Sequence, residues 1–233
     1  KLAYISTIIV AAGKGNRMGT RLPKQFLKIE NNTILYHTLD QFATIETIDE
    51  IIVVVAREYL DSEILQASLP SQLQSKQVKL IAGGSSRQES VGKGLNRLDE
   101  RTDIVVVHDG VRPFVTQTII EKNIEQCRTK DAILTAFPVT DTLKEIKRDH
   151  VIGTLDREKI WSAQTPQTFK TELLKAAYEK AIEEDLQATD EAGLMEKYQK
   201  VHVIRGDKHN FKITHKEDLL LARALYQEKT NDL

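Results

Sequence analysis

Cationic side chains gather around two glycines near the start of the chain. Isoleucine and valine at residues 8–10 lead into Gly13 and Gly15, and no acidic residue occurs between Lys1 and Ile29. The cations of this segment are Lys14, Arg17, Arg21, Lys24 and Lys28. Exposed backbone N–H groups beside local positive charge are what a polyphosphate requires. Because the whole chain carries a formal net charge of -1, the charge is local, and the segment is predicted to bind phosphate groups.

Two common phosphate-binding motifs are excluded by the residues that follow Gly13. A P-loop needs Gly-Lys-Ser/Thr beginning five residues after its first glycine, but Met18 stands at that position. The dinucleotide-binding fingerprint needs a third glycine at the same position, and Gly19 comes one residue too late. What remains is a different loop, Gly-x-Gly-x-Arg-Met-Gly, which is followed by Pro23-Lys24-Gln25.

The elements that must position this loop alternate along the chain. Apolar runs predict strands at residues 8–10, 51–55, 78–81, 104–107, 132–137 and 201–204. Helical spacing predicts helices over 33–42, 59–69, 86–98, 116–127, 171–184 and 189–198 and from 216, whereas 161–169 is predicted to be an irregular connection. Strand–helix alternation favours an α/β fold, a single Rossmann-like three-layer domain over residues 1–233 with a mostly parallel sheet.

Two further turns are predicted to face the same ligand as the glycine loop. Gly83-Gly84 follows the strand at 78–81, and His108-Asp109-Gly110 follows the strand at 104–107. Parallel sheets of this kind bind ligands beyond the carboxyl ends of their strands. The three turns are therefore expected to share one edge of the sheet.

Residues 138–160 depart from the alternation of strands and helices. Two segments with alternating apolar residues are joined by Lys147-Arg148-Asp149-His150, a pattern that predicts a β-hairpin. Isolated hairpins are marginally stable in water, and no neighbouring helix covers this one. We expect a protruding arm, covered by a second subunit.

The composition is that of a folded globular protein. With 40% hydrophobic and 29% charged residues and a net charge near zero, neither disorder nor a nucleic-acid partner is indicated. No run of 18 apolar residues and no signal-peptide pattern occurs, so no membrane association is expected and the cytoplasm is the expected location. The one cysteine, Cys127, has helical spacing with Ile120 and Ile124, which favours a core position.

Seven motifs, taken in order, are more specific together than any one is alone. They are Ala11-Ala12-Gly13-x-Gly15-x-Arg17-Met18, Pro23-Lys24-Gln25, Gly83-Gly84 before Ser86-Arg87, His108-Asp109-Gly110-Val111-Arg112-Pro113, Thr165-Pro166-Gln167, Thr189-Asp190-Glu191-Ala192 and Asn210-Phe211-Lys212-Ile213-Thr214. This set resembles the 2-C-methyl-D-erythritol 4-phosphate cytidylyltransferase family, and the related ribitol-5-phosphate cytidylyltransferases. The resemblance runs from about residue 8 to the last predicted helix.

The resemblance implies that a phosphate oxygen of a polyol phosphate attacks the α-phosphorus of CTP and that pyrophosphate leaves. Such a nucleophile is already an anion, so cations are the expected catalytic residues. By resemblance these are Arg17 and Lys24 at the transition state, with Lys14 at the pyrophosphate, and Arg157 and Lys212 at the acceptor phosphate. Replacing Arg17 with alanine is expected to lower kcat by orders of magnitude.

The resemblance also implies a pocket for the cytidine nucleotide. Its residues are Ala11, Ala12, Gly13, Lys14, Gly15, Gly83, Gly84, Ser85 and Ser90. Position 85 departs from the family pattern, because many members carry aspartate there. That departure leaves the strictness for CTP open.

A metal and an acceptor site complete what the resemblance implies. Asp109 would bind Mg²⁺, or another divalent cation, on the triphosphate. The acceptor would contact Asp109, Arg112, Thr142, Arg157, Thr165, Thr189 and Lys212. Thr142 and Arg157 lie on the predicted arm, which in this family reaches into the partner's site, so a homodimer with composite sites is expected.

Two alternatives remain at this point. Val111 and the missing aspartate at position 85 favour ribitol 5-phosphate as the acceptor, whereas the motif at 189–192 and the pair Arg157 and Trp161 favour the erythritol phosphate. A regulatory module that binds CTP without turnover would keep the glycine turns, but it would not need Lys24, Arg157 and Lys212 together.

Overall fold

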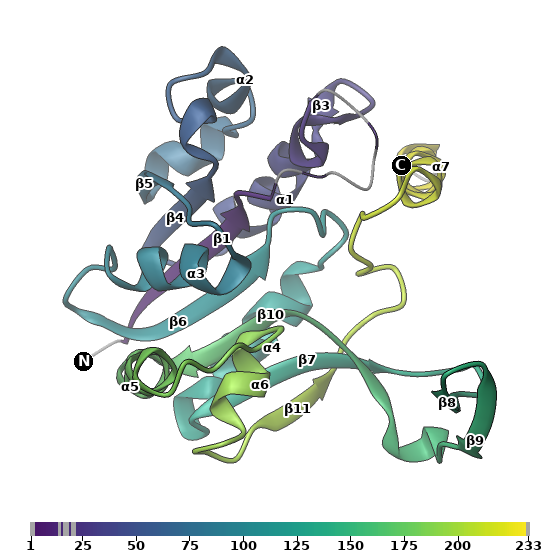
Figure 1. Ribbon diagram of the computed structural model, residues 1–233. Helices are drawn as coiled ribbons and strands as arrows, with labels where there is room; N and C mark the ends of the chain where they lie inside the picture. The colour runs from purple at the N-terminus through teal and green to yellow at the C-terminus, as the bar shows by residue number, and fades with distance from the viewer. Residues whose placement is uncertain (1–2, 14, 16–18, 20–21, 232–233) are drawn as a thin grey trace.

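The computed structural model of the protein describes residues 3–13, 15, 19 and 22–231. Its centre is a seven-stranded sheet in the order β11-β7-β10-β6-β1-β4-β5 (Figure 1). The strands are β1 (Tyr4–Ala11), β4 (Glu50–Val55), β5 (Gln77–Ala82), β6 (Thr102–Asp109), β7 (Ala132–Pro138), β10 (Trp161–Lys170) and β11 (His202–Arg205). All of them run parallel except β10, which is antiparallel to both of its neighbours.

Helices cover both faces of the sheet, so the predicted three-layer α/β arrangement is confirmed. Along β1, Ile5 and Ile9 point to one core and Ile8 to the other, as the period of two in a strand requires. The first core includes side chains of α1 (Ile34–Ala43), α2 (Glu63–Gln66) and α4 (Gln117–Thr129), and the second includes those of α3 (Arg87–Leu95), α5 (Thr171–Glu183) and α6 (Glu191–Met195). Cys127 is buried in the first core, as predicted.

A third, smaller core lies beside the sheet. It joins the short strand β2 (Lys28–Ile29), the start of α1, the segment after β6, and the last helix α7 (Lys216–Asn231). The strand β2 pairs with another short strand, β3 (Asn32–Thr33). Its buried side chains include Ile29, Val111, Phe114, Ile213 and Ala222. The segment that leads into α7 is therefore held by this cluster rather than by pairing in the sheet.

The prediction of an irregular connection at 161–169 was wrong. These residues form β10, which pairs with β6 on one side and β7 on the other. The sequence hid the strand because it is polar and contains Pro166, which sits where the register with β7 shifts, between Ala163 and Gln167. Proline is tolerated at such a break because no ladder hydrogen bond is required there. The Thr165–Pro166 peptide bond is cis.

The helix predicted over 59–69 is broken into shorter pieces. A 3-10 turn, η3 (Arg57–Tyr59), is followed by α2, and another, η4 (Ser71–Ser75), follows Pro70. Ser62 starts α2 as an N-cap by accepting a hydrogen bond from the Leu65 amide. A capping residue in mid-segment begins a new helix instead of continuing an old one.

The predicted hairpin is confirmed, and it stands away from the domain (Figure 1). Its strands are β8 (Lys144–Lys147) and β9 (His150–Thr154), which pair only with each other. Ile146 and Val151 face each other across the ladder, and each is 55% exposed. Ile152 and Trp161 are also exposed large apolar side chains. The arm therefore presents apolar surface that nothing in this chain's described part covers.

None of the described helices has the length and apolar character that a membrane span requires.

Candidate active site

The carboxyl ends of β1, β5 and β6 meet at a cavity of about 500 Å³. Its described lining is Val10, Ala11, Ala12, Gly13, Gly15, Lys24, Gln25, Gly84, Ser85, Ser86, Arg87, Ser90, Asp109, Val111, Lys212 and Thr214. The prediction that the three turns share one edge of the sheet is therefore confirmed. We call this cavity the nucleotide pocket.

The turn after β1 is held by a glutamine that the sequence analysis did not assign to the site. Gln25 is buried, and its Nε2 donates to the carbonyl oxygens of Ala11 at 2.6 Å and Gly13 at 3.1 Å. The same 3-10 turn, η2 (Lys24–Phe26), brings Lys24 to the pocket wall. Gly15 has a φ of +68°, and a Cβ there would stand 3.0 Å from the Lys24 amide nitrogen, so glycine is needed for this approach. Lys14 and Arg17 lie outside the described residues.

The turn after β5 packs tightly against the turn after β1. A Cβ on Gly83 would collide with the Ala12 side chain, so small residues at both positions let the two turns close. The Gly84 amide donates to Ser90 Oγ at 3.0 Å, and Ser90 Oγ donates to the Ser86 carbonyl at 2.8 Å. Gly84 and Ser90 line the pocket, whereas Gly83 supports it from behind.

Ser85 is tied to a carboxylate on the next helical turn. Its amide and its hydroxyl both donate to Glu89 Oε2 at 2.7 Å. These hydrogen bonds, from the hydroxyl first and then the amide, lower the pKa of Glu89 to about 2. An ionised carboxylate therefore stands beside position 85 at neutral pH.

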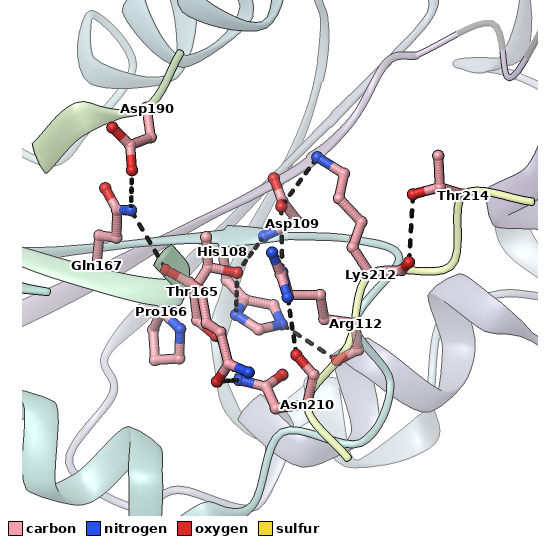
Figure 2. Close-up of polar contacts among 12 residues, drawn as sticks. His108, Asp109, Arg112, Thr165, Pro166, Gln167, Asp190, Asn210, Lys212 and Thr214 are labelled. Atoms are coloured by element: carbon pink, nitrogen blue, oxygen red, sulfur yellow. Dashed lines mark hydrogen bonds and ion pairs between the residues drawn. The ribbon is translucent and has the colours of Figure 1, made fainter. Parts of the chain in front are cut away.

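Asp109, at the end of β6, is surrounded by three cations. Oδ1 accepts from Arg87 Nε at 3.0 Å. Oδ2 lies 3.3 Å from Arg112 Nε and 3.0 Å from Lys212 Nζ (Figure 2). Asp109 is 5% exposed. Burial alone would raise its pKa, but the charges of Arg87, Lys212 and Arg112 outweigh burial and hold the pKa well below its usual range. The carboxylate is therefore ionised at neutral pH.

Arg87 and its anchors were missed as site residues. Its Nη1 donates to Glu191 Oε1 at 2.9 Å, and Tyr178 donates its hydroxyl to the same oxygen at 3.0 Å. Glu191 is 1% exposed. The motifs Ser86-Arg87 and Asp190-Glu191 were the signal in the sequence, but nothing there pairs two positions that are 104 residues apart.

A second cavity of about 200 Å³ adjoins the first and shares Arg87, Asp109 and Lys212 with it. Its other described lining residues are Arg112, Ala163, Gln164, Thr165, Gln167, Thr189 and Asp190. We call it the acceptor pocket. It brings together Asp109, Arg112, Thr165, Thr189 and Lys212 of the predicted acceptor site.

The two predicted arm residues are not brought to either cavity of this chain. Thr142 and Arg157 are exposed, and neither is among the described residues that line the nucleotide or the acceptor pocket. Arg157 donates from Nη1 to the Thr140 carbonyl at 2.9 Å, within the arm.

The donor set suits a divalent cation that brings most of its own ligands. No group of three or more His, Cys, Asp or Glu side chains able to hold a metal occurs in the part of the chain that the structure describes. Mg²⁺ commonly binds through one or two carboxylates together with substrate phosphates and water. Asp109, on the wall shared by both pockets, could supply one such carboxylate oxygen once the Lys212 ammonium, 3.0 Å from Oδ2, turns aside.

The site has glycine-rich turns around a cationic cavity at the carboxyl edge of a parallel sheet, and a second cationic pocket adjoins it. This arrangement is typical of a nucleotidyltransferase. A family model for 2-C-methyl-D-erythritol 4-phosphate cytidylyltransferase matches residues 5–228. The chain belongs to this family.

Individual relatives agree with the family model. The chain is 40% identical to the 2-C-methyl-D-erythritol 4-phosphate cytidylyltransferase of Alkaliphilus metalliredigens over 97% of this chain and 94% of that protein. The corresponding protein of Clostridioides difficile is 38% identical over 97% of this chain and 95% of that protein. Among solved structures, the 4-diphosphocytidyl-2C-methyl-D-erythritol synthase of Anaerococcus prevotii matches with a TM-score of 0.84 and 32% identity, over 97% of this chain and 96% of that one.

Proposed function

We propose that this protein transfers CMP from CTP to the phosphate of 2-C-methyl-D-erythritol 4-phosphate and releases pyrophosphate. The observation that carries the proposal is the ionised Asp109 at the junction of two pockets, with Arg87, Arg112 and Lys212 around it. Such a junction suits a reaction between a triphosphate in one pocket and a phosphate in the other. Family membership favours the erythritol phosphate over ribitol phosphate and over a module without turnover.

The reaction forms one P–O bond and breaks another. A phosphate oxygen of the acceptor attacks the α-phosphorus, and the bond from that phosphorus to the β-phosphate oxygen breaks, so pyrophosphate takes the electron pair. Because the nucleophile is an anion, no side chain has to remove a proton. The protein's task is to position two anions and to neutralise the charge that grows on the equatorial and leaving oxygens.

Each part of this task has a candidate on the pocket walls. Lys24, which is 8% exposed, would neutralise charge at the α-phosphate, and Lys212 and Arg112 would hold the acceptor phosphate. Arg17 and Lys14 remain candidates from the sequence alone. Asp109 would hold Mg²⁺ on the triphosphate, and the bound ion would withdraw charge from the phosphate oxygens.

Pyrophosphate release tests the function. With CTP, Mg²⁺ and 2-C-methyl-D-erythritol 4-phosphate, we expect stoichiometric pyrophosphate and a cytidine diphosphate product, which mass spectrometry would identify. Ribitol 5-phosphate and a reaction without acceptor are the controls, and both should give background release. Release with ribitol 5-phosphate alone would establish the other acceptor, and none with either would reject the enzymatic proposal.

We propose in addition that the active form is a homodimer whose arms complete each other's sites. Arg157 and Thr142 lie on an exposed arm, away from both pockets of their own chain. Ile146, Val151 and Ile152 are exposed apolar side chains on the arm, and an unpartnered hairpin is marginally stable in water. A second copy of the chain would cover this surface and receive Arg157 at its acceptor pocket. The cytoplasmic location stays a prediction from the sequence.

An aspartate at position 152 should separate the subunits. Burying an unpaired carboxylate in an apolar contact is unfavourable, so Ile152→Asp should shift the protein toward monomer in size-exclusion chromatography with light scattering, and activity should fall with it. Ile182→Asp is the matched control, because Ile182 lies on α5 and is 78% exposed. An unchanged dimer with Ile152→Asp would contradict this use of the arm.

A further inference from the structure

His108 occupies a buried position directly before Asp109 that the proposed reaction does not use. The side chain is fully buried at the end of β6, against the ring of Phe42. Its Nδ1 lies 2.9 Å from Thr165 Oγ1, and its Nε2 lies 3.3 Å from the Arg112 carbonyl oxygen (Figure 2). Both ring nitrogens therefore have a partner from a residue of the acceptor pocket.

The partners fix which nitrogen carries the proton. A carbonyl oxygen only accepts hydrogen bonds, so the Arg112 carbonyl requires a proton on Nε2. His108 is fully buried, and its two ring nitrogens contact a hydroxyl and a carbonyl rather than a carboxylate, so the ring is neutral and Nδ1 has a lone pair. The hydrogen bond at 2.9 Å must then run from the Thr165 hydroxyl to His108 Nδ1.

With this assignment, the Thr165 hydroxyl can only accept a further hydrogen bond. Its single proton is given to His108, and its oxygen already accepts the Asp109 amide at 3.1 Å. A hydroxyl oxygen has two lone pairs, so one remains. In the acceptor pocket, Thr165 can therefore accept a hydrogen bond and cannot donate one.

The acceptor pocket is polarised by this arrangement. Arg112 and Lys212 supply hydrogen-bond donors and positive charge, which suit a phosphate. Thr165, as an acceptor, suits a group that donates, and it would disfavour a phosphate oxygen. A molecule with a phosphate at one end and a hydroxyl within reach of Thr165 matches both.

We propose that His108 is a positioning residue that fixes the Thr165 hydroxyl as a hydrogen-bond acceptor for a hydroxyl group of the acceptor substrate. This inference rests on the proposed function and deepens it, because it assigns the recognition of the polyol, rather than of its phosphate, to a buried pair of side chains.

Two substitutions of His108 test the roles of its two ring nitrogens separately. The amide oxygen of His108→Asn can stand near the position of Nδ1 and still accept from Thr165, whereas the amide of His108→Gln reaches the position of Nε2. We expect His108→Gln to raise KM for the erythritol phosphate roughly tenfold, the size of one neutral hydrogen bond, with KM for CTP unchanged. His108→Asn should stay within about twofold of the wild type.

The same comparison in a Thr165→Val background provides the control. Without the hydroxyl there is nothing for His108 to orient, so His108→Gln and His108→Asn should have equal KM values for the acceptor in that background. A difference between them that persists with Thr165→Val, or a rise in KM for CTP with His108→Gln, would overturn the inference.

A direct measurement covers the case in which a variant fails to fold. In the wild-type protein, long-range ¹⁵N–¹H NMR of His108 should show a proton on Nε2 and none on Nδ1, and a ring protonated on Nδ1 would overturn the inference. The tautomer does not depend on turnover. A wild-type protein that releases no pyrophosphate would instead reject the proposed function.

Discussion

Replacing Asp109 with asparagine should nearly abolish nucleotidyl transfer and also destabilise the protein. The amide cannot neutralise Arg87, Arg112 and Lys212, which lie within 3.3 Å of the carboxylate oxygens. Removing one partner of a buried ion pair costs about 3–5 kcal/mol; we expect the lower value, because Lys212 is a third exposed and can turn to water. Loss of the carboxylate that we propose to hold Mg²⁺ should lower kcat by at least about 100-fold. Urea unfolding and steady-state kinetics would measure the two effects.

The destabilisation should depend on pH in a defined direction. The folded state lowers the pKa of Asp109, so its ionisation contributes stability above the unfolded pKa of about 3.9 and loses that contribution as pH falls further. The difference in the free energy of unfolding between wild type and Asp109→Asn should therefore be complete at neutral pH and shrink below about pH 4. Asp103→Asn, at the exposed opposite end of β6, is the matched control. Asp103 accepts the Tyr4 amide at 2.8 Å, and the asparagine oxygen can still accept it, so neither stability nor rate should change.

Replacing Lys24 with methionine should lower kcat by about 100- to 1000-fold while changing KM for CTP much less. Methionine keeps most of the length and removes the charge from a position that is 8% exposed on the wall of the nucleotide pocket. A charge that acts mainly on the transition state changes kcat more than ground-state binding. Steady-state kinetics with varied CTP would measure both constants.

Lys28→Met tests whether removing any positive charge near the nucleotide pocket lowers kcat as much as removing Lys24. Lys28 is exposed on β2, four residues further along the same cationic segment, and it is not among the described lining residues of the nucleotide pocket. Its replacement should leave kcat within about twofold, as is usual for a solvated surface lysine. Equal losses for the two variants would show that the segment acts through its overall field, and a normal kcat for Lys24→Met would remove Lys24 from the mechanism.

The elements that could be predicted from the sequence are those whose own apolar residues indicate that they are buried. The apolar run at 51–55 became β4, with every residue from Glu50 to Val55 buried. The strand β10 could not be found this way, because Gln167 and Thr168 are polar yet fully enclosed by their neighbours in the sheet. Its burial comes from β6 and β7, which lie elsewhere in the chain.

The site residues also fall into two groups, those that the local sequence predicts and those that depend on distant parts of the chain. The glycine turns and Asp109 follow strands that the sequence reveals, so their meeting at one edge could be expected from the sheet alone. Arg87 could not be assigned a role, because its partner Glu191 comes from α6, and the Tyr178 hydroxyl that donates to Glu191 comes from α5. His108 likewise had no visible role until β10 placed Thr165 beside it.

The third core affects which part of the site opens first when the protein is heated. Lys212 stands on the segment between β11 and α7, and Ile213 next to it is buried in the small cluster with Val111 and Phe114 rather than in either core of the sheet. Proteins open in cooperative units, and the units with the fewest buried apolar contacts open first. We therefore expect the segment that carries Lys212 to open before the sheet that carries Asp109, so heating should disrupt the two pockets at a lower temperature than it unfolds the sheet.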